Sequence, residues 1–189
     1  TRALILAPTR ELAQQIHSDC LQLTKFTKLH TVCLLGGTDY DKQSEQLTQG
    51  FVDIIIATPG RLIDFCFQHK VYLDRLEVLV LDEADRMLDM GFIPDIKRLI
   101  RMMPDNTHRQ TLLFSATFNQ DVMNLAYRWL YQPVFVEIEP EQKTSENIEQ
   151  KFYMLTESQK IAALDEIISE VEGGKVIIFA NRKDQVRRL

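Results

Sequence analysis

Three carboxylates stand together directly after a short apolar run. Residues 78–81 (VLVL) are followed at once by Asp82, Glu83 and, after one alanine, Asp85. Carboxylate oxygens are the ligands that Mg²⁺ prefers, so Asp82 could hold that ion. Glu83 could orient or deprotonate an attacking water molecule. The same residues could equally end a strand and cap the next helix, and this stretch alone leaves both interpretations open.

Two other places combine a polar helix start with an arginine. Residues 9–10 (TR) follow the apolar run 3–7 (ALILA), and residues 58–61 (TPGR) follow the run 52–57 (VDIIIA). Threonine favours the N-cap position of a helix, and proline favours the first helical position. The free N–H groups at such a helix start, with an arginine beside them, suit a phosphate group. Each arginine could also be an ordinary solvated surface charge.

Small residues close two further apolar runs. A glycine pair at 36–37 follows residues 30–35 (HTVCLL), and 115–117 (SAT) follow residues 111–114 (TLLF). A glycine pair permits either a tight turn or a close backbone approach to a ligand. The hydroxyl residues could hydrogen-bond the acidic residues at 82–85, or they could form a turn that caps the following helix.

The apolar runs predict the elements that position these residues. They are short, rich in Val, Ile and Leu, and lack polar alternation, which is typical of strands buried on both faces of a parallel sheet. Apolar residues at helical spacing separate the runs, so we expect an α/β fold with helices flanking the sheet. Such sheets bind ligands at the carboxyl ends of their strands. Two helix starts with arginine and a glycine pair at that edge suggest a row of phosphate contacts spaced for a nucleic-acid backbone.

Composition limits the class of protein. The 189 residues are 45% hydrophobic and 26% charged, which is ordinary for a globular protein. The formal net charge of −5 gives no reason to expect nucleic-acid binding, so any such site must be local. The three cysteines lack metal-site spacing and are expected to be reduced thiols of a cytoplasmic protein. No apolar run is long enough to span a membrane.

The end of the chain reads as a second α/β unit. A sixth strand is expected at 133–138, and two more at 148–155 and 176–180. A helical stripe of apolar residues runs from 161 to 171 between the last two, and Asn181 is positioned to cap a further helix. Both ends of the chain look cut, so we expect an excerpt of a longer protein. The expected organisation is a first domain at 1–138, a polar linker at 139–147 and the start of a second domain at 148–189.

In chain order the motifs read PTRELA at 8–13, GG at 36–37, TPGR at 58–61, DEAD at 82–85 and SAT at 115–117. In this order and spacing they resemble the DEAD-box family of ATP-dependent RNA helicases (superfamily 2) over essentially the whole chain. The resemblance implies an incomplete first RecA-like domain followed by the start of a second one. Residues 138–144 (IEPEQKT) are most similar to the bacterial RhlB type, for which mRNA turnover with an RNA-degrading complex is the expected setting.

The resemblance also implies roles for individual residues. Asp82 would hold the Mg²⁺ of bound MgATP through water, and Glu83 would activate the water that hydrolyses ATP. Asp85 would also serve the nucleotide site, and with Ser115 and Thr117 would couple it to RNA binding and domain closure. Contacts to the sugar–phosphate backbone of one RNA strand are implied for Thr9, Arg10, Gly37, Thr58, Gly60 and Arg61, and in the second domain for Asn181 and Lys183.

Several parts of that family's pattern have no counterpart in these 189 residues. The glycine-rich phosphate loop with its Lys and Ser/Thr is absent, as are the strand before it, the adenine-reading glutamine motif and the arginine fingers. Arg182 stands where the family usually has threonine. We therefore expect this stretch alone neither to hydrolyse ATP nor to unwind RNA. The alternatives are a truncated RNA- or protein-binding module without ATPase activity, or a related translocase acting on DNA, many of which carry histidine at the position of Asp85.

Overall fold

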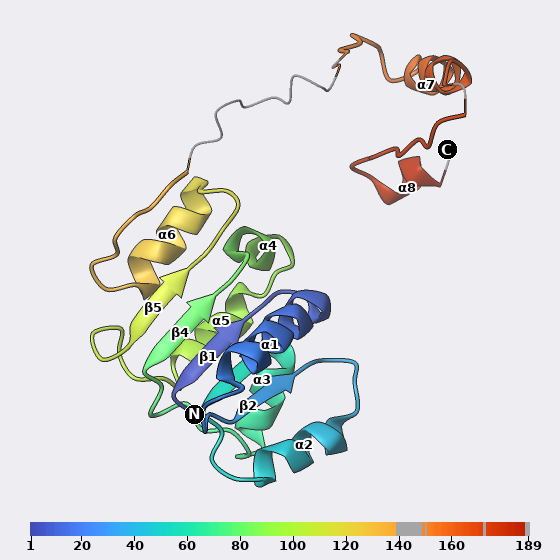
Figure 1. Cartoon of the computed structure of the whole chain (residues 1–189). Coiled ribbons are helices and arrows are strands. Elements are labelled where there is room, and N and C mark those ends of the chain that lie inside the picture. The colour runs from blue at the N-terminus through green and yellow to red at the C-terminus, as the bar shows by residue number, and fades with distance from the viewer. Residues whose placement is uncertain (139–148, 150, 172, 188–189) are drawn as a thin grey trace. The chain divides into compact units, whose positions relative to one another are not determined.

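A five-stranded sheet forms the centre of the first part of the chain (Figure 1). The computed structural model describes residues 1–138, 149, 151–171 and 173–187. They form two compact units, Thr1–Val136 and Glu137–Leu189, and each is described by itself. The sheet lies in the first unit with all neighbours parallel and the order β2-β3-β1-β4-β5. Its strands are β1 (Ala3–Leu6), β2 (Thr31–Leu34), β3 (Ile54–Ala57), β4 (Val78–Leu81) and β5 (Gln110–Leu113).

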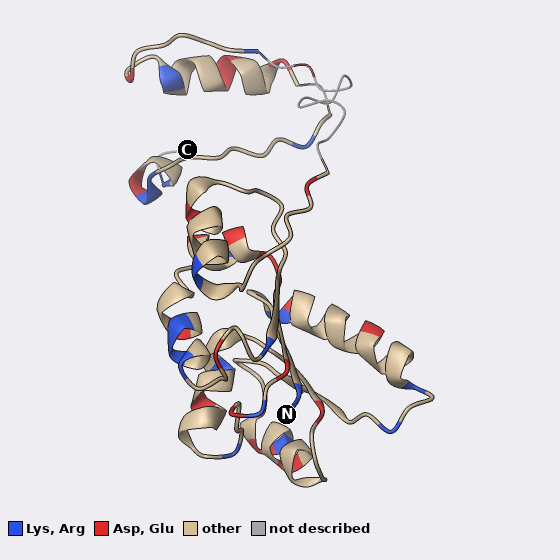
Figure 2. Cartoon of the chain, turned by 90° about the vertical axis from the view of Figure 1, so that its left-hand side faces the viewer, with Lys and Arg blue, Asp and Glu red and all other residues tan. Residues whose placement is uncertain are grey.

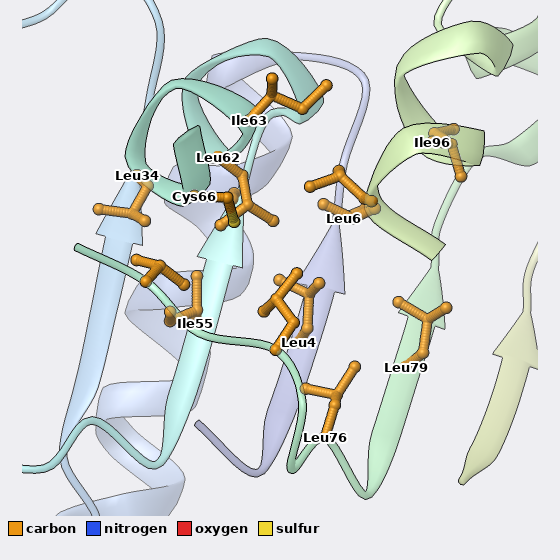
Figure 3. Packing of buried hydrophobic residues seen from close by; sticks show 14 of the residues in the cluster. Leu4, Leu6, Leu34, Ile55, Leu62, Ile63, Cys66, Leu76, Leu79 and Ile96 are labelled. Carbon is orange, nitrogen blue, oxygen red and sulfur yellow. The ribbon is translucent and has the colours of Figure 1, made fainter. Parts of the chain in front are cut away.

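Helices cover both faces of this sheet, as the α/β prediction requires. On one face, α1 packs through Ala13 against a small cluster that includes Ile56 and Leu35. On the other face, a larger cluster joins the strands to four helices (Figure 3). The helices of the first unit are α1 (Arg10–Thr24), α2 (Tyr40–Thr48), α3 (Pro59–Phe67), α4 (Ala84–Asp89), α5 (Ile93–Ile100) and α6 (Gln120–Trp129).

The larger core follows from the alternation of side chains along the strands. Leu4 is in register with Ile55 on one neighbouring strand and has Leu79 beside it on the other, and all three are fully buried. Leu62 of α3 and Ile96 of α5 belong to the same cluster (Figure 3). Each such side chain contributes roughly 1.5–3 kcal/mol when it leaves water. The core therefore holds the central strands in one register, and this register sets the positions of the strand ends.

The expected sixth strand at 133–138 is wrong: these residues belong to no strand in the structure. A strand needs a neighbour whose backbone groups complete its hydrogen bonds, and a suitable sequence alone does not supply one. Val134 and Ile138 are instead about nine-tenths exposed.

The second unit shows helices but no strands among its described residues. These helices are α7 (Lys160–Ser169), which confirms the predicted stripe, and α8 (Lys183–Val186). The expected strand at 176–180 is not formed, and neither is that at 148–155 in the residues described there. Asn181 does not cap a helix, because α8 begins only after Arg182. The expected linker at 139–147 lies outside the described residues. Within the described chain, no helix combines the length and apolar character needed to cross a membrane.

Candidate functional site

The residues singled out in the first unit follow the carboxyl ends of the five strands. Because all neighbouring strands are parallel, these ends meet at a single edge of the sheet. The three strands β2, β3 and β1 lead into the GG, TPGR and PTR residues, and the adjacent β4 and β5 lead into DEAD and SAT. The sheet order therefore places the predicted phosphate contacts on one half of the edge and the acidic residues on the other half.

The acidic turn is fixed by the strands on either side of it. The backbone N–H of Asp82 donates to the carbonyl of Leu6 on β1 at 3.0 Å, and that of Ala84 donates to Phe114 after β5 at 3.0 Å. Between them Glu83 adopts left-handed backbone angles of φ 50° and ψ 55° and directly precedes α4. A non-glycine residue in this region is strained, and such residues gather at functional sites. The alternative that these residues cap the next helix is right in position, because Glu83 occupies the N-cap of the short helix α4, but its side chain makes no capping hydrogen bond.

The side chain of Glu83 is held by a neighbour on the next turn. Its Oε2 atom lies 3.4 Å from Nη1 of Arg86, in an ion pair whose side chains are 38% and 56% exposed. An exposed pair at this distance contributes little energy, so Glu83 is free to exchange Arg86 for another partner.

Asp82 has one carboxylate oxygen engaged and one available. Its Oδ1 atom accepts the N–H of Glu83 at 2.9 Å, and Oδ2 accepts no hydrogen bond from the described residues. The described part of the chain also contains no group of three or more His, Cys, Asp or Glu residues gathered as for a metal ion. One carboxylate supplemented by water suits Mg²⁺, which keeps several of its waters, better than an ion that needs a full set of protein ligands.

Asp85 lies within hydrogen-bonding distance of the SAT residues, as one of the two sequence interpretations expected. Its Oδ2 atom accepts both the N–H of Thr117 at 3.0 Å and the hydroxyl of Thr117 at 2.9 Å. The hydroxyl of Ser115 accepts the backbone N–H of Asp85 at 3.2 Å and donates to the carbonyl of Thr117 at 2.8 Å. Three residues from two adjacent strand ends therefore form one network.

The other interpretation of the SAT segment is also partly right. A turn after β5 does lead into α6, but the residue that caps this helix is Asn119, whose side chain accepts the N–H of Val122 at 2.9 Å. The hydroxyls of Ser115 and Thr117 are thus left to the acidic turn.

The network lowers the pKa of Asp85. Partial burial acts to raise this pKa, but the hydrogen bonds that the carboxylate accepts, led by that from the Thr117 hydroxyl, outweigh it. Asp85 is consequently charged at neutral pH, and its charge is tied to the position of Thr117.

On the other half of the edge, Gly37 and Arg10 lie against each other. Gly37 has a φ of +72°, and a Cβ atom placed on it would lie 3.0 Å from Nη1 of Arg10. The left-handed backbone favours glycine here, and an added Cβ would also oblige the flexible Arg10 side chain to shift. The structure therefore joins the end of β2 to the start of α1 across β3.

Thr58 connects the ends of β3 and β2. It occupies the N-cap position before α3, but its side chain makes no capping hydrogen bond. Its hydroxyl instead accepts the N–H of Gly36 at 3.2 Å, and the residue is only 8% exposed. The predicted helix start is correct in position, and Pro59 supplies it, whereas the threonine side chain fixes the glycine pair.

The side chain of Arg61 contacts the same loop. One guanidinium nitrogen, Nη2, donates to the carbonyl of Thr38 at 3.1 Å, and the group lies 5.4 Å from the ring centre of Tyr40. The other, Nη1, is shielded from solvent and has no hydrogen-bond partner among the described residues. A guanidinium N–H in this state suits an acceptor such as a phosphate oxygen.

The remaining predicted RNA contacts are Thr9 and Gly60 in the first unit and Asn181 and Lys183 in the second. The Thr9 hydroxyl accepts the N–H of Leu12 at 3.3 Å and so caps α1 as predicted. Gly60 lies in the first turn of α3 with no atom that would obstruct an added Cβ within 4 Å. Asn181 and Lys183 belong to the second unit.

Sequence reasoning missed residues that support this edge from α2. Tyr40 stacks on Phe65 with ring centres 4.5 Å apart and carries Arg61 on its ring. Gln43 is buried and hydrogen-bonds Leu35 and Thr38, on either side of the glycine pair. The segment is mostly polar, and the signal for its helix was Asp39, whose side chain caps α2 through the N–H groups of Asp41 and Lys42.

Charge alone does not mark the site. Lys and Arg alternate with Asp and Glu over the elements of the first unit instead of gathering on one of them (Figure 2). The favourable groups at the edge are instead individual arginines, backbone N–H groups and helix starts.

Comparison with known proteins gives consistent matches. A family described as DEAD/DEAH box helicase matches residues 1–125. A protein named ATP-dependent RNA helicase RhlB from Pseudomonas aeruginosa (strain UCBPP-PA14) is 54% identical over 188 residues, which are 100% of this chain and 47% of that protein. Proteins of the same name are 53% identical in Pseudomonas putida, again covering 47% of the relative, and 49% identical in Xanthomonas axonopodis pv. citri, covering 33%. The chain thus spans between a third and half of the length of these curated relatives.

Proposed function

The chain belongs to the DEAD/DEAH box helicase family, and we propose that it is part of an ATP-dependent RNA helicase that couples ATP hydrolysis to RNA binding and local duplex opening. The observation that carries this proposal is the sheet order. It sets the residues of three phosphate-type motifs on adjacent strands, directly beside the acidic turn and the SAT residues. A similarity to the bacterial RhlB proteins over the whole chain supports the same function.

The acidic turn is the proposed nucleotide half. Asp82 would hold Mg²⁺ through water, which the free oxygen of its carboxylate permits. Bound Mg²⁺ would neutralise charge on the phosphates of ATP. Glu83, with a side chain only loosely paired to Arg86, would orient and deprotonate the attacking water.

The network of Asp85, Ser115 and Thr117 is the proposed link between nucleotide and RNA. Asp85 lies in the first turn of α4, and Thr117 directly precedes the segment that leads into α6. A change at the nucleotide that moved Asp85 would break or remake two hydrogen bonds to Thr117. Such a network can report the state of one site to the other.

The glycine pair and the two arginines form the proposed RNA half. Thr9, Arg10, Gly37, Thr58, Gly60 and Arg61 would serve the sugar–phosphate backbone of one strand, and none of these contacts would read a base. The unpaired Nη1 of Arg61 supports this role most directly. RNA binding is therefore proposed to be tolerant of sequence.

The second unit is proposed to be the start of another RecA-like domain, with domains at 1–138 and 148–189 joined by the linker at 139–147. Asn181 and Lys183 would add RNA contacts from that side. Arg182, at the position where the family usually has threonine, pairs with Asp184 through two contacts of 3.0 and 2.8 Å. A cytoplasmic setting and an RNA-degrading complex as partner are also proposed; co-purification of ribonuclease activity with the tagged protein would test the latter.

The test of the proposed function is RNA-stimulated ATP turnover by the protein at its native length. Turnover is expected to rise with RNA and to fall by about 10²-fold or more in Glu83→Gln, since general base catalysis contributes on that scale. Glu45→Gln, which alters an exposed carboxylate on α2, is the matched control and should behave as wild type. Turnover that ignores RNA, or that survives in Glu83→Gln, would contradict the proposal and favour a module that only binds RNA or protein.

A further inference from the structure

A buried glutamine hydrogen-bonds residues on either side of the glycine pair. Gln43 on α2 is 7% exposed, although glutamine side chains are mostly found at the surface. A buried amide is costly unless its donors and acceptor are all satisfied. The hydrogen-bond partners of Gln43 therefore indicate its role.

The amide of Gln43 pairs with both backbone groups of Leu35. Its Oε1 atom accepts the N–H of Leu35 at 2.8 Å, and its Nε2 atom donates to the carbonyl of the same residue at 3.2 Å. Because a backbone N–H can only donate, the first contact fixes which way the amide points. Leu35 directly follows β2, an edge strand with a neighbour on one side only. Gln43 thus satisfies the N–H and the carbonyl of Leu35, which a neighbouring strand would otherwise satisfy.

The same amide also holds the far side of the loop. Nε2 lies 2.6 Å from the hydroxyl of Thr38 and 3.0 Å from the carbonyl of Asp39. Its two hydrogens are shared among three acceptors in this way. The hydroxyl of Thr38 in turn donates to the carbonyl of Leu35 at 2.9 Å, so the start and the end of the loop converge on one side chain.

In this loop, the backbone of Gly37 is available to contact a ligand. Gly36 is held by the Thr58 hydroxyl, and the Thr38 carbonyl is held by Arg61. No hydrogen bond from the described residues engages the backbone of Gly37, whose left-handed conformation lies against Arg10. Its conformation depends on the loop residues on either side, and Gln43 hydrogen-bonds Leu35 before the glycine pair and Thr38 after it.

We propose that Gln43 is a positioning residue that fixes the 35–39 loop so that the backbone of Gly37 meets the RNA strand. This inference rests on the proposed function, in which Gly37 contacts RNA. Gln43 itself touches no ligand: it acts by raising the fraction of molecules in which the loop is ready to bind. When that fraction falls, the apparent affinity for ligand falls by the same factor.

The test compares Gln43→Leu with Gln46→Leu in the protein at its native length. Both changes replace an α2 glutamine by leucine, but Gln46 is exposed. In Gln43→Leu the concentration of single-stranded RNA that gives half-maximal ATP turnover should rise about tenfold, because the loop is ready to bind in about one-tenth as many molecules. The turnover rate at saturating RNA should be retained, since RNA then restores the loop. Gln46→Leu should leave both quantities unchanged.

A second variant guards against simple loss of folding. Thr38→Val removes a partner of Gln43 at an exposed position and should raise the half-maximal RNA concentration in the same direction by about threefold. Gly37→Ala strains the loop directly, so its effect should be less than additive with that of Gln43→Leu. The proposal would be overturned if the half-maximal RNA concentration were unchanged in both Thr38→Val and Gln43→Leu. It would also be overturned if turnover at saturating RNA fell by the same factor as the apparent affinity for RNA. Absence of RNA stimulation in the wild type would refute the proposed function itself.

Discussion

At the scale of residues, Asp85 accepts more hydrogen bonds than the other two carboxylates of its turn. Thr117 supplies two of them and the N–H of Arg86 a third. Because its pKa is lowered in the folded protein, Asp85 stabilises the fold above its ordinary pKa of about 3.9 and loses this contribution as the pH falls further. Asp85→Asn should lower the free energy of unfolding by about 1 kcal/mol at pH 7.

Urea midpoints of the native-length protein at neutral pH and at about pH 3.5 would test this, since the gap between wild type and Asp85→Asn should narrow below the ordinary pKa of an aspartate. Asp89→Asn on the same short helix α4 is the control, because Asp89 is exposed and accepts no side-chain hydrogen bond from the described residues. A gap that stays constant with pH would mean that the charge of Asp85 does not contribute.

The sequence predicted this network in part. A hydroxyl pair after one buried strand and a carboxylate after another gave the possibility that Asp85 meets Thr117, because the strands of a parallel sheet end at one edge. It gave no sign that Glu83 adopts left-handed angles, since residue type does not favour that conformation for glutamate. It also gave no sign of Gln43, whose role depends on where α2 lies against Leu35.

At the scale of elements, α1 and α6 begin in the same way and differ in what lies before them. Thr9 caps α1 and Asn119 caps α6, each by accepting an N–H three residues on. Thr9→Ala and Asn119→Ala should each lower stability by about 1 kcal/mol. Only Thr9→Ala should also weaken RNA binding, because the first N–H groups of α1 lie on the proposed RNA half of the edge.

Thermal melting and titration with a labelled single-stranded RNA would separate the two effects. Thr9→Ser keeps a hydroxyl and should restore both properties. Equal loss of RNA binding in Asn119→Ala would show that the effect comes from general destabilisation and not from the start of α1.

Helix starts were predicted correctly because residues close in sequence determine them. Strands were predicted wrongly where they would need a partner strand from elsewhere in the chain. The helix starts at Thr9 and at Pro59 were predicted because capping and proline geometry are encoded within a few residues. The apolar runs at 133–138 and 176–180 look the same in sequence as β3 or β4, yet they form no strand, since their backbone groups find no partner strand among the described residues.

At the scale of the whole molecule, the two units differ in their cores. The first unit buries a continuous cluster of side chains on its sheet. The described residues of the second unit bury none, and Met154 and Phe179 are almost fully exposed. A helix stripe and apolar runs without a core cannot offset the entropy of ordering the chain. Among its described residues, the second unit therefore lacks the buried core that stabilises the first.

The same argument applies to catalysis by this stretch of chain. Asp82 and Glu83 are the proposed Mg²⁺ ligand and base, but no residue run here matches the glycine-rich loop whose backbone and lysine hold the phosphates of ATP. Since phosphoryl transfer is accelerated mainly by positioning and charge neutralisation, residues 1–189 alone should show no ATP turnover above background, with or without RNA. The measurement is phosphate release at millimolar MgATP, beside the native-length protein as the positive control. Turnover by the stretch that disappears in Glu83→Gln would contradict this expectation, because it would show that the acidic turn and the SAT network can bind and cleave ATP unaided.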